Sequence, residues 1–87
     1  MGARDSSRKG PLHDPAYRQL CGLLRQWRED AGLPQRELAA KLKKIHTYVA
    51  KSEQGERRID PIEMIRWARA CNLKPSKALK QIEPLVK

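Results

Sequence analysis

Two neighbouring stretches decide the fold of this chain: GLPQRELA at residues 32–39 and VAKSEQGERR at residues 49–58. The first places a glycine and a proline before a short run whose apolar residues have helical spacing. The second closes a helical run with a glycine and continues into two arginines. The pattern predicts two short helices, at about residues 34–42 and 46–54, joined by a tight turn and followed by a basic loop.

Helical signals continue on both sides of this pair. Asp14-Pro15 supplies an N-cap and a proline at the first helical position, and residues 60–63, DPIE, have the composition of a capping box. Gly32 and Asn72 suit left-handed helix ends, and Pro84 ends the last helix. The helices are therefore expected at about residues 15–31, 34–42, 46–54, 60–71 and 75–83.

No stretch shows the sustained alternation of apolar and polar residues that is typical of strands. Residues 1–13 are polar, contain glycine and proline, and lack any periodicity. We therefore expect an all-α protein with a flexible, disordered, basic N-terminal arm at residues 1–13. Because 87 residues allow a single domain, residues 14–87 are expected to form one compact five-helix domain.

The core is expected where apolar residues share one face of each helix. Trp27 and Trp67 lie in such stripes and are expected to be core residues. Cys21 and Cys71 are expected to be small buried residues, although a disulfide between them is possible. The other expected core residues are Leu20, Leu24, Ala31, Leu38, Ala39, Leu42, Val49, Ile62, Ile65, Ala68, Leu79 and Ile82.

The formal net charge of +9 favours partners rich in phosphate, above all nucleic acid. No apolar run approaches the roughly 18 residues of a membrane span, and the polar start is unlike a secretory signal. We therefore expect a cytoplasmic protein without a membrane partner. The cysteines and histidines lack metal-site spacing, and no phosphate-binding glycine loop or acidic pair suggests catalysis. No metal, no cofactor and no enzymatic activity are expected.

Six residues of the two short helices stand at a characteristic spacing: Gln35, Leu38, Ala39, Val49, Glu53 and Gly55. In kind and spacing they resemble the phage-repressor or XRE-like helix-turn-helix family, over about residues 20–79. The resemblance implies a lambda-repressor-like DNA-binding domain whose second short helix enters the major groove of double-stranded DNA. It implies a prokaryotic or phage transcription regulator, a repressor that works as a homodimer at the nucleoid. An antitoxin-like or a coactivator-like protein-interaction module on the same fold remains an alternative.

The resemblance assigns base contacts to the second short helix, at His46, Thr47, Ala50 and Lys51. Their chemistry agrees, because a small Thr or Ala can meet a thymine methyl, Lys can donate to guanine, and His can donate or accept. The four share one helix face, opposite Val49. His46 could instead be an ordinary exposed residue.

Other residues are implied to position the duplex through its backbone. The implied phosphate contacts are Gln35, Arg36, Lys43, Lys44, Tyr48, Gln54, Arg57 and Arg58. Tyr48 could instead pack beside the preceding helix, and the lysines near the turn could form only a solvated basic surface. The resemblance also pairs Arg28 with Glu53 in an internal salt bridge.

Three positions depart from the family pattern. Pro34 stands where Ser or Thr usually caps the helix, and the missing cap could cost ~1 kcal/mol. Lys43 stands where glycine is usual, so it must tolerate a left-handed conformation at a cost of roughly 1 kcal/mol, or the turn must differ. Ser52 underfills a position that is normally large and apolar, which Trp67 could compensate.

The end of the sequence leaves two apolar residues, Leu85 and Val86, after Pro84 with no further helix to cover them. Exposed apolar residues at the edge of a small domain often mark a self-association surface, so we expect the dimer contact there. The alternative is that both residues fold back onto the first helix near Leu23.

Overall fold

Side-chain caps begin two of the five α-helices in the computed structural model, which describes residues 14–87. The expected arm at residues 1–13 lies outside the described residues. The Asp14 carboxylate accepts a 3.0 Å hydrogen bond from the Ala16 N–H, and Asp60 and Glu63 form a reciprocal capping box. The elements are α2 (Pro15–Asp30), α3 (Gln35–Leu42), α4 (His46–Gln54), α5 (Pro61–Ala70), α6 (Pro75–Ile82) and the 3₁₀ turn η1 (Glu83–Leu85).

The tight turn between α3 and α4 depends on a left-handed residue. Lys43 has φ 58°, and its backbone N–H donates to Ala40 O at 3.1 Å while the N–H of Lys44 donates to Ala39 O at 2.9 Å. These bonds close α3 as a glycine would, so a lysine occupies the geometry in which the family usually has glycine. Asn72 also adopts a left-handed conformation, with φ 59°, as its place after α5 predicted.

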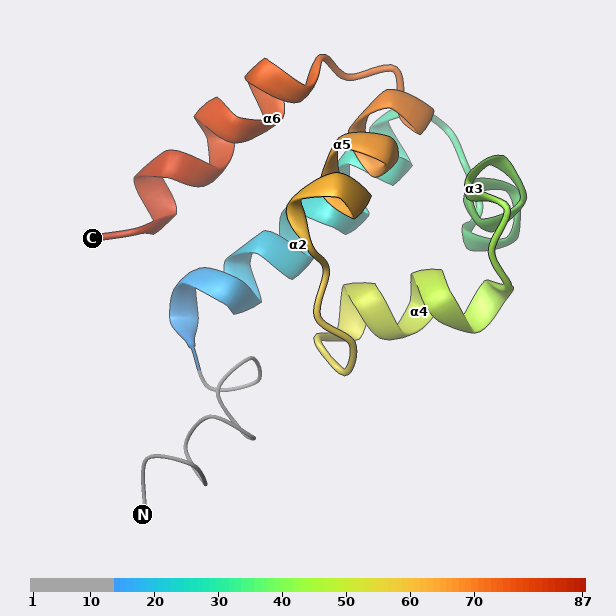
Figure 1. Cartoon of the computed structure of the whole chain (residues 1–87), viewed down its shortest axis with the longest axis horizontal. Helices are drawn as coiled ribbons and strands as arrows, with labels where there is room; N and C mark the ends of the chain where they lie inside the picture. Colours follow the sequence, from blue (N-terminus) through green and yellow to red (C-terminus); the bar gives the residue numbers. More distant parts are fainter. Residues whose placement is uncertain (1–13) are drawn as a thin grey trace.

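The α3–α4 pair and α6 lie at opposite ends of the molecule, with α2 and α5 between them (Figure 1). α3 and α4 make a corner at one end of the molecule, and α4 packs against both α3 and α2. α2 and α5 run through the centre, and α6 extends from α5 at the other end. Residues 14–87 contain five α-helices and no strand, which confirms the expected all-α class.

Two tryptophans join the central helices to their neighbours. Trp67 of α5 is fully buried, and its Nε1–H donates to Leu24 O of α2 at 3.1 Å. Trp27 of α2 is buried as well, and its Nε1–H donates to Gln81 Oε1 of α6 at 2.8 Å. Each ring thus fills the core while its polar hydrogen finds an acceptor, as burial of Trp requires. Cys21 and Cys71, expected to be buried, are buried free thiols.

The prediction that two residues, Ile62 and Leu79, belong to the core is wrong. Ile62 is 56% exposed and Leu79 is 59% exposed. In α6 the fully buried residue is Ala78, whose small side chain lets the helix approach its neighbours. Because α6 has only two turns, several rotations of the helix place some apolar residue inward. Contacts with other helices choose the rotation, and here Gln81 is turned toward Trp27.

The two apolar residues after Pro84 behave differently. Leu85 is partly buried and belongs to η1, which packs against α2, so this residue follows the fold-back alternative. Val86 is 67% exposed. With Leu79 it leaves two large apolar side chains uncovered in the C-terminal part of the chain.

We predict that Lys43→Gly raises the free energy of unfolding by about 0.5–1 kcal/mol, because glycine carries no Cβ penalty at positive φ. Urea unfolding followed by circular dichroism measures this change. Lys44→Gly is the matched control, since it removes a lysine from the same turn at a residue without positive φ, and it should give no stabilisation. A Lys43→Gly protein no more stable than the control would show that Lys43 is not strained.

Candidate nucleic-acid interface

A buried ion pair joins α2 to α4. Arg28 Nε lies 2.5 Å from Glu53 Oε2 and Arg28 Nη2 lies 3.0 Å from Glu53 Oε1, and the two side chains are 9% and 5% exposed. Nη1 of the same guanidinium donates to Leu33 O at 2.8 Å, so it also holds the loop between α2 and α3. The hydrogen bond with Glu53 raises the pKa of Arg28. Both charges are therefore used inside the domain.

Gln35, the first residue of α3, extends this ion pair toward the surface. Its Nε2 donates to Glu53 Oε1 at 3.0 Å. Because a carboxylate only accepts, the amide must turn its NH₂ group toward Glu53 and its oxygen away. His46 Nε2 lies 2.9 Å from that oxygen, so this nitrogen carries the proton and donates it. Glu53 thus fixes the first side chain of α3 and, through it, the first side chain of α4.

These contacts change what Gln35 can do. The sequence implied that it holds a DNA phosphate, but its amide oxygen and one of its two N–H donors have partners inside the protein. Only the second N–H of the amide is left to reach a phosphate. His46 is likewise held by Nε2, so its other ring nitrogen is the one that can face a ligand.

α4 turns one face away from the domain. Val49 is fully buried on the inner side, whereas His46, Thr47 and Lys51 are exposed and Ala50 is half-buried. The structure therefore brings the four candidate base-reading residues onto one accessible helix face. α4 itself lies along an edge of the molecule, with α2 and α3 packed behind it (Figure 1).

Ile45, directly before α4, is a residue of this surface that the sequence analysis did not select. It is 73% exposed, more than any other large hydrophobic residue in the described part of the chain. It lines a shallow hollow of about 280 Å³ together with Lys44, Thr47, Tyr48, Lys51 and Arg57. The available signal was an isoleucine outside every helical stripe, next to the lysines of the turn.

Arg57, expected to contact phosphate, also makes contacts inside the domain. Its Nη2 lies 2.5 Å from Glu63 Oε2, its Nη1 donates to Oε1 at 3.2 Å, and its guanidinium carbon lies 4.3 Å from the centre of the Tyr48 ring. The bond from Arg57 holds the pKa of Glu63 at about 2. Burial, with the Glu63 charge, raises the pKa of Tyr48 to about 12, so its hydroxyl stays a donor. The sequence indicated Glu63 only as a capping residue.

Tyr17 of α2 contacts the loop between α4 and α5, which contains Arg57. Its hydroxyl accepts from the Ile59 N–H at 2.8 Å and lies 3.4 Å from Arg57 O, to which it donates. The exposed Arg58 places its guanidinium carbon 5.3 Å from the centre of the Tyr17 ring. Burial raises the pKa of Tyr17, which keeps the hydroxyl protonated. Nothing in the sequence marked this tyrosine, because its partners are far away along the chain.

The other candidate phosphate contacts lie at the surface. Arg36, Lys43, Lys44 and Gln54 are all exposed. Within residues 14–87, none of the three cations has a carboxylate at ion-pair distance. Lys44 Nζ lies 5.3 Å from the centre of the Tyr48 ring, near enough for a cation–π contact. These charges remain available to an anionic ligand.

Among residues 14–87, no group of three or more His, Cys, Asp or Glu side chains is placed to hold a metal ion. In the same range, no helix combines the length and the apolar character needed to cross a bilayer. Burial raises the pKa of the Cys71 thiol to about 11 and also raises that of Cys21.

Comparisons with known proteins agree with this geometry. The helix-turn-helix family model matches residues 24–77. Among solved structures, the chain is similar to an XRE-family like protein from Pseudomonas syringae pv. tomato str. DC3000, with 34% identity and a TM-score of 0.79 over 94% of this chain and 99% of that one. No curated protein sequence matches the chain. The chain therefore belongs to the XRE family of helix-turn-helix proteins and has the fold of a DNA-binding transcription regulator.

We predict that Glu53→Gln destabilises the fold by about 3–5 kcal/mol, because it leaves the buried Arg28 charge without its partner. Arg28→Met combined with Glu53→Gln should recover part of that loss, since no unpaired charge then stays buried. Thermal and urea unfolding of the wild type, both single variants and the double variant give the coupling energy. Strictly additive effects would contradict an energetic role for the pair.

Glu63 should make stability depend on pH in acid. Its pKa is lowered from 4.5 to about 2 in the folded protein, so between these values the unfolded chain binds a proton that the folded chain does not. This contribution is complete above about pH 5 and is lost as the pH falls toward 2. Glu63→Gln, which can keep the capping box, should lose less stability than the wild type over that interval. Parallel stability profiles of the two proteins would contradict this prediction.

Proposed function

We propose that this protein is a sequence-specific repressor of transcription whose DNA-binding domain spans residues 14–87. In this proposal α4 lies in the major groove of double-stranded DNA, as the second helix of a helix-turn-helix does. The observation that carries the proposal is the outward face of α4. Thr47 and Lys51 are exposed there, opposite the fully buried Val49, and the lysines of the preceding turn have no carboxylate partner within residues 14–87.

Each base-reading residue has a distinct role in this proposal. Lys51 donates to guanine O6 or N7, and Thr47 and Ala50 contact thymine methyl groups. His46 already donates from Nε2 to Gln35, so in the neutral ring Nδ1 accepts from the amino group of adenine or cytosine. The exposed Ile45 adds an apolar contact at the edge of the same surface.

The phosphate contacts position the duplex without reading it. In this proposal Gln35 uses its remaining N–H, and Tyr48 uses the hydroxyl that its raised pKa keeps protonated. The cationic contacts are Arg36, Lys43, Lys44 and Arg58, and Gln54 adds a neutral one. Arg57 contributes indirectly, because it is bound to Glu63 and supports Tyr48.

A homodimer would read two half-sites about one helical turn apart and repress by excluding polymerase from the occupied DNA. We assign the two-fold contact to the C-terminal part of the domain, around the exposed Leu79 and Val86. In Figure 1 this part lies at the opposite end of the molecule from α3. The proposed protein acts at the nucleoid in the cytoplasm, without a cofactor and without catalysing a reaction.

Base readout can be separated from phosphate binding by mutation. Lys51→Ala and Thr47→Ala should each cost ~1–3 kcal/mol on the preferred site and relax preference at one or two positions. The exposed Lys77 of α6 provides the control, since Lys77→Ala removes the same charge away from α4. Titrations on matched and randomised duplexes measure the difference. Equal losses on both DNAs would remove these residues from base readout.

The dimer contact has its own test. Leu79→Ser with Val86→Ser should shift sedimentation toward monomer and weaken binding to a duplex with two half-sites. The helical content should stay the same, because both side chains are exposed. Ile62→Ser is the control, since it removes an equally exposed apolar side chain from α5. Unchanged sedimentation of the double variant would place the interface elsewhere or make the protein a monomer.

A further inference from the structure

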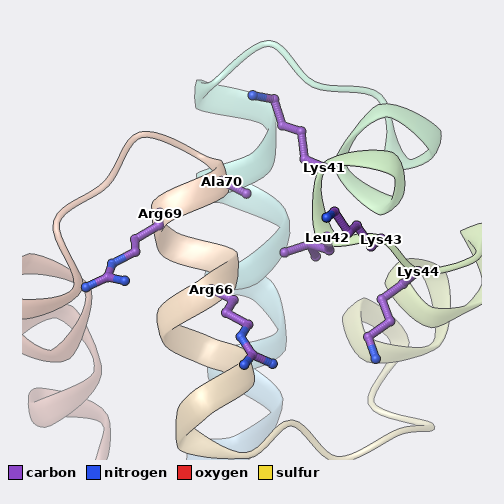
Figure 2. Close-up of a pocket in the computed structure, with 7 residues that line it drawn as sticks. All are labelled: Lys41, Leu42, Lys43, Lys44, Arg66, Arg69 and Ala70. Atoms are coloured by element: carbon purple, nitrogen blue, oxygen red, sulfur yellow. The ribbon is translucent and has the colours of Figure 1, made fainter.

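A second feature of the surface is a groove between the end of α3 and α5 (Figure 2). Its volume is about 620 Å³, within the range of ligand-binding clefts. It is lined by Lys41, Leu42, Lys43, Lys44, Arg66, Arg69 and Ala70. One wall is α5, a helix outside the α3–turn–α4 unit, and the proposed contacts with DNA use no residue of that wall.

The charged residues that line the groove are all positive. The lining contains five cationic side chains and no carboxylate. Within residues 14–87, none of the five has an acidic partner at ion-pair distance. Arg28 and Arg57 differ from them, because each is bound to a glutamate. A concave surface lined by one sign of charge concentrates ligands of the opposite sign.

The positions of the charges select the shape of the ligand. Figure 2 shows Lys44 and Arg66 on either side of one end of the groove and Lys41 at the other end, while Arg69 points toward α6. The charges are therefore spread along the groove and are not gathered at one point. They can contact successive negative charges along an extended ligand.

The apolar residues of the groove select the chemistry of the ligand. Leu42 points from α3 toward α5, and Ala70 faces the groove from the end of α5. Leu42 and Ala70 together form an apolar strip among the charged side chains of the groove. Phosphates and sugars of a nucleic-acid backbone do not match such a strip, whereas apolar side chains of a protein segment do.

We propose that this groove binds an acidic segment of a partner protein that carries apolar side chains on the face it turns toward Leu42. Carboxylates of the segment pair with Lys41 and Arg66, and its apolar side chains rest on Leu42 and Ala70. A second copy of this chain is a poor occupant, because its net charge of +9 repels the same surface. The site lies beside the proposed DNA surface and shares Lys43 and Lys44 with it, whereas Lys41, Arg66, Arg69 and Ala70 belong to the groove alone.

The test uses two fluorescent helical peptides. One has glutamates on one face and leucines on the other, and the second has serines in place of the leucines. Both are titrated against the wild type, Lys41→Glu/Arg66→Glu and the control Lys77→Glu/Lys80→Glu. The control changes two exposed lysines of α6, so its net charge equals that of the groove variant. The same three proteins are titrated with a DNA duplex, and circular dichroism verifies that each is folded.

The proposal expects the leucine peptide to bind the groove variant about tenfold or more weakly than the control, as loss of two charge contacts implies. It also expects the serine peptide to bind the wild type more weakly than the leucine peptide does. Both variants should bind the DNA duplex with the same affinity. When the leucine peptide is added to ¹⁵N-labelled wild-type protein, the largest changes in amide chemical shift in the NMR spectrum should be those of residues in α3 and α5. Equal peptide affinity of the two variants, or equal affinity of the two peptides, would overturn the proposal. A larger loss of DNA affinity in the groove variant would assign the groove to DNA instead.

Discussion

The Arg28–Glu53 ion pair is the interaction on which the arrangement of the site depends. A buried pair gains little net stability over apolar residues of the same volume, because removing two charges from water costs about as much as their attraction returns. Its contribution here is positional. One guanidinium fixes α4 through Glu53 and the α2–α3 loop through Leu33 O, and the carboxylate fixes Gln35 and, through it, His46. These contacts tie the start of α3 to both the end and the start of the proposed recognition helix.

Five basic residues near the proposed DNA surface divide into two groups with different roles. Arg28 and Arg57 are bound to glutamates and hold helices and the loop in place. Lys43, Lys44 and Lys51 are exposed, and within residues 14–87 they have no carboxylate at ion-pair distance. The net charge alone does not separate these groups. The surface that faces an anionic partner is defined by the second group, which extends from α4 across the turn into the groove beside α5.

Sequence patterns predicted the features of this fold that depend on neighbouring residues. The helix bounds and the capping box involve residues within a few positions of one another. The features that these patterns missed depend on how separate helices and loops pack together. The Arg57–Glu63 contact, the Tyr17 hydroxyl under the loop and the rotation that exposes Leu79 are set by which helices meet. The family pattern alone paired Arg28 with its distant partner, and composition or periodicity could not have done so.

In the proposed function α4, held by the ion pair, reads a DNA sequence as part of a dimer. Selection of duplexes bound by the whole protein from a random DNA pool tests it most directly. We expect an enriched palindromic sequence whose two halves are centred about 10 base pairs apart, the spacing of one helical turn. An unpalindromic consensus would contradict the dimer. A pool that stays random, despite measurable binding, would contradict sequence reading by α4.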